Sequence, residues 1–298
     1  HAELVNLVHL NDGKSFATRP FRPKTDVVAG FPAYGNPEDQ QTYDRVSDVF
    51  RTAQSQRYNI SVSGGDAKTN FYIGGEYQDQ ESTLKLQDFS RYSFRVNLDH
   101  SISPKFKIGT SNSLSSVPRR LVRVGDGPAG LFQAGLHTPT FYPIYNEDGS
   151  FSRPTVFDNH IAILENSDSH SNSLRSINNL YATYNIIPGL SFKSSVSNDY
   201  NNYHEKAYFN TNLVYGQPAG EADDAITTKQ TLTAEQLLNF NSFKGKNNFS
   251  VFLGNTLQYT KTDRESLVGK GFSTNQFKRI ASAAIQTASS SGSDYGLI

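Results

Sequence analysis

The sequence contains no cysteine, no methionine and no tryptophan. The absence of cysteine excludes disulfides and thiolate metal sites. The chain also lacks net charge, with 28 basic and 28 acidic residues, and without an excess of Lys and Arg we expect no nucleic-acid partner. A chain without methionine lacks an initiator residue, so we interpret its 298 residues as a mature or internal piece of a longer protein.

Long apolar runs are missing as well. Hydrophobic residues make up 36% of the chain and its mean hydropathy is −0.54. No stretch approaches the roughly 18 apolar residues that a membrane helix needs, which excludes helical membrane spans. A membrane β-barrel remains open, because barrel strands are apolar only at every second position.

What the sequence does contain is alternation with a period of two. In RYSFRVNLDH, residues 91–100, Tyr92, Phe94, Val96 and Leu98 fall on one side and polar or charged residues on the other. This pattern is typical of a β-strand with one apolar face. Similar segments follow one another along the chain, separated by turn-forming residues. We predict an all-β protein with strands near 56–64, 69–80, 89–102, 105–117, 173–187, 190–204, 230–243 and 247–262.

The predicted connections alternate in length. Four are tight turns, GGDAK, SPK, IPG and KGKN, whereas three of the others are long, near 119–172, 205–230 and 263–298. One end of the sheet would therefore carry short turns and the other mostly long loops, as in outer-membrane barrels. Polar residues in mid-strand, such as Arg95 and Lys193, would line a wet lumen in a barrel or face solvent in a soluble sandwich. The alternation alone leaves both architectures open.

Several sequence blocks follow one another in a recognisable order. They are VFRTAQSQRYNISVSGGDAKTNFYIGGEYQDQES, FSRYSFRVNLDHSISPKFKIG, FYPIYNEDGSF, HIAILENSDSHSNSLRSINNLYATYNIIPGLSFKSSV and NNFSVFLGNTLQYTKTDRESLVGKGF. These blocks resemble the SusC/RagA group of TonB-dependent outer-membrane transporters, and the resemblance extends from about residue 48 to 273. It is specific because spaced blocks agree in order.

The resemblance implies a segment of a large antiparallel transmembrane β-barrel of about 22 strands in the full protein, located in the cell outer membrane and with long extracellular loops. Residues 1–298 would be a partial barrel without the plug domain. They divide into an outer-loop lead-in (1–55), strands (56–118), a long extracellular loop (119–172), further strands (173–262) and a last extracellular loop (263–298). Phe94 and its apolar neighbours would then touch lipid, and Arg95, Asn97 and Asp99 would face the lumen or the plug.

The same resemblance implies nutrient import, with glycans or peptides as cargo. Its expected partners are a SusD-like surface lipoprotein, TonB through regions outside this chain, an oligosaccharide or peptide substrate and the lipid bilayer. Two alternatives stay open at this point. One is a passive or structural outer-membrane barrel, and the other is a soluble β-rich module that binds carbohydrate.

No residue pattern predicts catalysis, so we expect no enzyme, no catalytic or metal-ligating residue and no cofactor, and we assign no substrate-binding residue. Gly125, Gly127 and Gly130 in GDGPAG match a dinucleotide fingerprint, but Pro128 and the absence of a βαβ pattern favour a loop. His137, His160, His170 and His204 could gather in the outer loops, where solvated histidines are the commoner case. The aromatics of the long loop could stack on sugar or peptide, or pack the loop onto the barrel rim: Phe132, Phe141, Tyr142, Tyr145 and Phe151.

Overall fold

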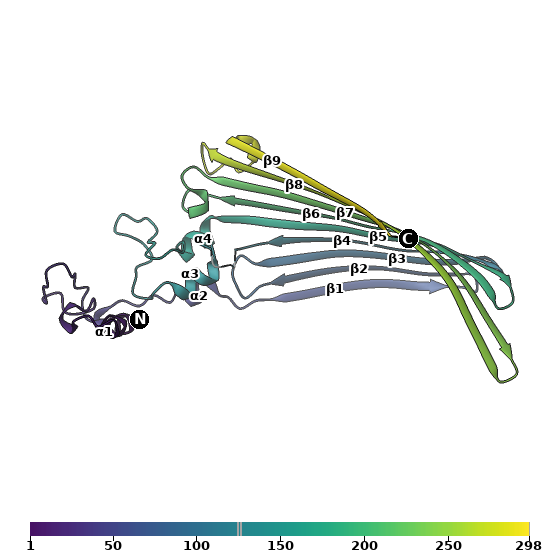
Figure 1. The fold of residues 1–298 in the computed structure, drawn as a ribbon, viewed down its shortest axis with the longest axis horizontal. Coiled ribbons are helices and arrows are strands. Elements are labelled where there is room, and N and C mark those ends of the chain that lie inside the picture. Colours follow the sequence, from purple (N-terminus) through teal and green to yellow (C-terminus); the bar gives the residue numbers. More distant parts are fainter. Residues whose placement is uncertain (124, 126, 298) are drawn as a thin grey trace.

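One antiparallel sheet dominates the structure. The computed structural model describes residues 1–123, 125 and 127–297, and in this part of the chain nine strands each pair with their sequence neighbours (Figure 1). Within the same residues, no helix is long and apolar enough to cross a membrane. The strands are β1 (Ser55–Gly65), β2 (Thr69–Glu81), β3 (Asp88–Ser103), β4 (Phe106–Arg120), β5 (Ser167–Ile187), β6 (Leu190–Phe209), β7 (Glu221–Lys244), β8 (Asn247–Phe272) and β9 (Ala283–Leu297).

All eight predicted strands are present, but several are longer than predicted and a ninth was missed. The expected loop over 263–298 is wrong, because β8 continues to Phe272 and β9 pairs with it from Phe272↔Ala283 to Gln258↔Leu297. The expected loop over 205–230 shrinks to residues 210–220, between β6 and β7. The extensions of β6 and β8 carry apolar residues next to one another, such as Tyr208 with Phe209 and Leu267 with Val268, so they show no strict alternation. They form because the neighbouring strand supplies a continuous hydrogen-bonding edge.

The two ends of the sheet differ as predicted. Short turns join β1 to β2, β3 to β4, β5 to β6 and β7 to β8 at one end, and Gly189 and Gly245 supply the positive φ that two of these turns require. The other end carries the longer connections and the short helices (Figure 1). These are α1 (Ala2–Asn11), α2 (Arg45–Val49), α3 (Leu131–His137) and α4 (His160–Asn166), with 3-10 turns at Phe16–Thr18, Pro37–Asp39, Val214–Gly216 and Ile280–Ser282.

One face of the sheet is largely apolar and has no layer packed against it. Directly paired residues share a face, and this places Phe94, Leu180 and Leu253 on the apolar side with 51%, 64% and 71% of their surfaces exposed. Aromatic residues stand near both ends of this face, as in the pairs Tyr77–Tyr92, with ring centroids 5.0 Å apart, and Phe106–Tyr184, at 6.4 Å. An apolar face flanked by two aromatic bands is typical of a membrane barrel.

The apolar face is interrupted by a row of three asparagines. Asn112, Asn178 and Asn198 are adjacent across β4, β5 and β6. The Asn112 and Asn178 amides each donate a hydrogen bond of 2.9 Å to a hydroxyl two residues earlier on the same strand, and Asn198 accepts one of 3.0 Å from Gln230. These local partners reduce the cost of placing amides on an apolar surface.

The larger of two buried hydrophobic clusters lies among the helices at the long-loop end, and the smaller one joins the strand ends there through Tyr208, Ala222, Phe272 and Ala283. Val49 of α2, Leu131 of α3 and Ile163 of α4 are completely buried together with Leu213. Gly135 permits this packing, since a Cβ on it would come within 3.0 Å of Val49. We call this region the loop layer, formed by α2, α3, α4 and the connections that pack on them.

Candidate functional site

The polar face of the sheet carries the most developed side-chain arrangement. A pocket of about 490 Å³ lies on this face across β1 to β5, and four arginines line it: Arg57, Arg91, Arg95 and Arg175. The strands set their places, because every second residue points to this face and the registers bring β1, β2, β3, β4 and β5 side by side. The result is a wall with a concentration of guanidinium groups.

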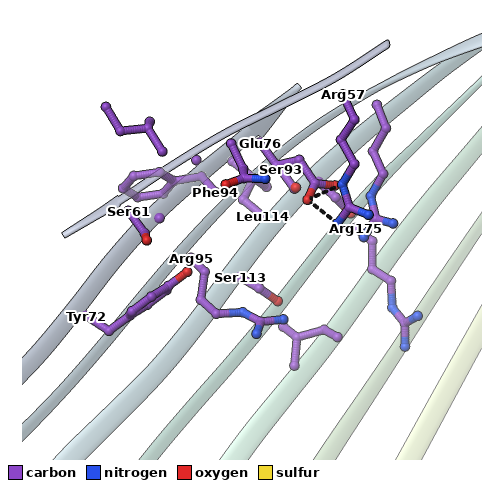
Figure 2. Close-up of a pocket in the computed structure, with 17 residues that line it drawn as sticks. Arg57, Ser61, Tyr72, Glu76, Ser93, Phe94, Arg95, Ser113, Leu114 and Arg175 are labelled. Carbon is purple, nitrogen blue, oxygen red and sulfur yellow. Dashed lines mark hydrogen bonds and ion pairs between the residues drawn. The ribbon is translucent and has the colours of Figure 1, made fainter. Parts of the chain in front are cut away.

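Two of the four arginines are neutralised by carboxylates on neighbouring strands. Arg57 of β1 donates from Nε and Nη2 to Oε2 of Glu76 on β2, at 2.9 and 2.5 Å (Figure 2). Arg175 of β5 donates from the same two nitrogens to both carboxylate oxygens of Asp199 on β6, at 2.9 and 2.6 Å. These cross-strand pairs fix the guanidinium planes against the wall.

The other two arginines have no carboxylate partner in the ion pairs that the described residues form. Arg91 and Arg95 are exposed and lie four residues apart on the polar face of β3. Serines stand beside them on the same face, because Ser93 pairs with Ser115 and Arg95 pairs with Ser113. This part of the pocket therefore offers positive charge above a row of hydroxyl groups (Figure 2).

Two tyrosine rings lie along the polar face because glycines leave room for them. Tyr72 covers Gly74 on its own strand, next to Arg95 across β2 and β3, and a Cβ at Gly74 would clash with the Tyr72 ring. Tyr181 covers Gly109 of β4 in the same way. Only glycine permits this close approach of a ring to the backbone.

Tyr181 belongs to a second polar network, nearer the short-turn end. Its hydroxyl donates to Asp99, and Lys107 lies 3.3 Å from the same carboxylate. The ammonium group of Lys193 sits 4.7 Å from the centroid of the Tyr181 ring. Asp99 and Lys107 form an ion pair here, whereas Lys193 contacts an aromatic ring.

The loop layer contains buried polar side chains that hydrogen-bond its segments to one another. Asn159 caps α4 with its side-chain oxygen and donates from Nδ2 to the carbonyls of Ile144 and Ser152, at 2.7 and 2.9 Å. The guanidinium of Arg45 donates to the carbonyls of Pro139 and Tyr142. Asp158, almost completely buried, accepts from the Val214 amide at 3.2 Å. Burial raises the pKa of Asp158 and lowers that of Arg45, because each charged form loses hydration.

The four histidines do not form one cluster in the outer loops: His137 and His160 lie in α3 and α4, whereas His170 and His204 lie on the neighbouring strands β5 and β6 and line one shallow pocket there. His160 contacts Asp48 at 3.0 Å, His170 contacts Asp168 at 2.7 Å and His204 contacts Asp224 at 2.6 Å. His137 packs against the Phe157 ring. Across the residues that the structure describes, no group of three potential ligands could hold a metal ion.

The remaining sequence candidates belong to the loop layer and its surroundings. Gly125, Gly127 and Gly130 precede α3, which has only seven residues, and Asp126 of the fingerprint lies outside the described residues. The loop aromatics pack on one another and on neighbouring loops. Their ring contacts are Phe141 with Phe21 and Tyr142, Phe132 with Phe50, and Tyr145 with Phe151.

Comparisons with known proteins agree with this architecture. No family model matches the chain. TonB-dependent receptor P3 of Formosa agariphila is 23% identical over 91% of the chain and 27% of its own length. TonB-dependent receptor SusC of Bacteroides thetaiotaomicron is 24% identical over 85% of the chain and 28% of its own length. The chain thus spans about a quarter of the length of these curated relatives.

Solved structures give the same result for the fold. The structure of the RagAB peptide transporter superposes with a TM-score of 0.71 at 21% identity, covering 86% of this chain and 30% of that chain. The structure of the RagAB peptide importer in the closed-closed state gives a TM-score of 0.69 with the same coverage. The sheet is therefore a segment of a large antiparallel transmembrane β-barrel, which sets aside the soluble binding module.

The curated relatives match 91% and 85% of the chain and therefore include most of the region in which the sequence blocks lie. In sequence and in fold the chain is similar to part of the barrel of SusC/RagA-type TonB-dependent transporters of the outer membrane. In that barrel the apolar face is the lipid-facing side and the polar face is the lumenal wall.

Proposed function

We propose that this chain forms part of the barrel wall of a TonB-dependent nutrient importer that takes up glycan or peptide fragments. The observation that carries the proposal is the alignment with SusC and with the RagAB peptide transporter over most of the chain. The lumenal wall adds support, because its ion-paired and free arginines form a polar surface suited to hydrated cargo or to a plug. The relatives are named receptors and importers, so we assign no catalytic step and no cofactor to this chain.

The long-loop end supplies a surface for a SusD-like surface lipoprotein, the partner that we propose by analogy with SusC. The loop layer there is a packed structure with its own buried core, and it can therefore present a fixed shape to a second protein. TonB would act through regions outside these residues. A passive barrel would share the same wall but would need no energy input.

Uptake measurements on the full-length transporter test this function. Cells that express it would be offered labelled oligosaccharide and peptide mixtures, with and without a working TonB system. We expect internalisation of at least one mixture that stops when TonB is removed. Uptake that continues unchanged without TonB would identify a passive pore, and absence of any uptake would contradict import.

A further inference from the structure

We propose that Arg91 and Arg95 form an anion-recognition site on the lumenal wall, and that the site selects oligosaccharides that carry carboxylate or sulfate groups. The proposal rests on the import function proposed above, and it names the class of cargo. The pocket holds four arginines, and among the residues that the structure describes only Arg57 and Arg175 of these four form ion pairs with carboxylates.

The positions of the free arginines suit a ligand with repeated negative charges. Both lie on the lumenal face of β3, and residues four apart on a strand are separated by roughly 13 Å along its axis. Their side chains are exposed, so each guanidinium can turn toward a ligand. The planar guanidinium group binds carboxylate and sulfate oxygens with two parallel hydrogen bonds, which a neutral ligand cannot match.

The surface between the arginines has the chemistry of a sugar-binding site. Ser93 lies between Arg91 and Arg95 on the same face, and Ser113 and Ser115 lie beside them on β4. Hydroxyl groups of a sugar can exchange hydrogen bonds with these serines. The Tyr72 ring, held along the wall over Gly74, adds a flat apolar surface next to Arg95 (Figure 2). Hydroxyls, a flat ring and separated positive charges together favour an acidic oligosaccharide over an acidic peptide.

The two ion-paired arginines determine where the positive charge of this site lies. Glu76 and Asp199 hold Arg57 and Arg175 at its borders, so the positive charge is concentrated on Arg91 and Arg95. A lumen wall with local excess charge attracts oppositely charged cargo, and the attraction weakens with salt.

Binding of oligogalacturonate to the purified full-length transporter tests the proposal. Fully methyl-esterified oligogalacturonate is the neutral control, a sulfated oligosaccharide is the second anionic probe and tetraglutamate is the peptide control. We expect the two acidic sugars to bind at least tenfold more tightly than the ester and tetraglutamate at low ionic strength. We also expect Arg95→Gln to weaken acidic-sugar binding about tenfold, as for loss of one charge-assisted hydrogen-bonded contact.

Lys193→Gln is the matched control variant, because it removes one positive charge from the same wall outside the pocket. If Arg95→Gln and Lys193→Gln weaken the binding of acidic sugars equally, the binding depends on the overall positive charge of the wall and not on a specific site, and the proposal is overturned. Equal binding of tetraglutamate would overturn the selection of sugars. An Arg95→Gln variant that melts earlier but binds the sugars normally would show that a carboxylate of the plug occupies Arg95. TonB-dependent uptake that persists while every acidic sugar fails to bind would overturn this inference and leave the import function standing.

Discussion

Arg175 of β5 and Asp199 of β6 form a bidentate ion pair on the lumenal wall, with N–O distances of 2.9 and 2.6 Å. The two residues are diagonal neighbours, since Arg175 is registered with Asn201 and Asp199 with Ile177. Both side chains are partly exposed, at 51% and 37%. A pair of this kind contributes little to stability, and its main effect is to occupy a guanidinium that would otherwise face the pocket.

Removing the carboxylate should therefore strengthen anion binding. We expect Asp199→Asn to tighten oligogalacturonate binding to the full-length transporter a few-fold at low ionic strength, because Arg175 becomes free to contact the ligand. The free energy of unfolding should change by less than about 1 kcal/mol. Glu235→Gln on β7 removes one negative charge from the same face away from the pocket and is the control. Identical binding by both variants would contradict the assignment of Arg175 to the pocket border.

Adjacent residues on β3 test which face meets lipid. Val96 lies on the apolar face and pairs with Ile73, whereas Asn97 lies on the lumenal face and pairs with Tyr72. An arginine that faces lipid near the bilayer midplane costs about 2–4 kcal/mol, whereas lumenal positions tolerate charge. We expect Val96→Arg to lower the amount of folded, heat-modifiable full-length protein in outer membranes and Asn97→Arg to leave it nearly unchanged. The reverse ranking would mean that the two faces are exchanged.

The buried contact between His160 and Asp48 makes the loop layer sensitive to acid. Burial lowers the pKa of His160 from its ordinary 6.5, and the charges of Arg45 and Lys85 act in the same direction, whereas the hydrogen bond and charge of Asp48 oppose them. As the pH falls through about 6.5, the unfolded layer takes up a proton that the folded layer resists, so its stability falls. Asp158 acts oppositely at lower pH, because its raised pKa favours protonation in the folded state.

Hydrogen exchange of the α4 amides measures this effect. After correction for intrinsic rates, exchange in the full-length transporter should be faster at pH 5.5 than at pH 7.5. In His160→Gln, which cannot titrate, the difference should largely disappear. The same acid response in both proteins would exclude His160 as its source.

Arg22 holds together the loop that follows α1. Its side chain is fully buried and donates to the carbonyls of Arg19, Asp26, Phe31 and Pro32 at 2.5–3.2 Å. Replacement by glutamine leaves several buried carbonyls without a donor, which should destabilise this loop by more than about 2 kcal/mol.

Limited proteolysis of the full-length transporter measures the loss. We expect new cleavage within residues 19–35 of the Arg22→Gln variant, while the amount of folded barrel stays unchanged. Arg19→Gln is the control, since the Arg19 side chain donates on the surface to the carbonyl of Phe16, at 2.9 Å, and lies over the Phe16 ring. Cleavage of both variants at equal rates would contradict the special role of Arg22.

Strands with one apolar face can be predicted from the alternation in the sequence, whereas strand segments without such a face cannot. Val96 and Leu98 alternate with polar residues, so β3 could be found from periodicity. Residues 283–297 read AAIQTASSSGSDYGL and give no such signal, because β9 is specified by its pairing with β8. Asn112, Asn178 and Asn198 could not be foreseen as one row, since they become neighbours only through the register of three strands.

The candidate site also has features that alternation predicts and features that depend on contacts between strands. The lumenal orientation of Arg95 follows from its place in the alternation. Which arginines are neutralised does not, because Arg57–Glu76 and Arg175–Asp199 are cross-strand contacts. The loop layer was also hidden, since Arg45 and His160 are charged or polar residues that sequence reasoning places at the surface, whereas both are almost completely buried.

Residues 1–298 taken alone form a sheet that does not close. Within the described residues β1 and β9 each pair on one side only, so the sheet has two open edges. In lipid every unsatisfied backbone N–H or C=O costs several kcal/mol, and an open sheet therefore cannot span a membrane. The apolar face also has no covering layer in this chain.

We therefore expect the isolated segment to form no membrane-inserted monomer. The segment would be refolded into vesicles that mimic the outer membrane, with the full-length transporter as a positive control. Heat-modifiable migration on a gel and protection from protease would report insertion, and both should appear only for the full-length protein. A compact, protected monomer of the segment would mean that its nine strands close on themselves, and the assignment to part of a larger barrel would then be wrong.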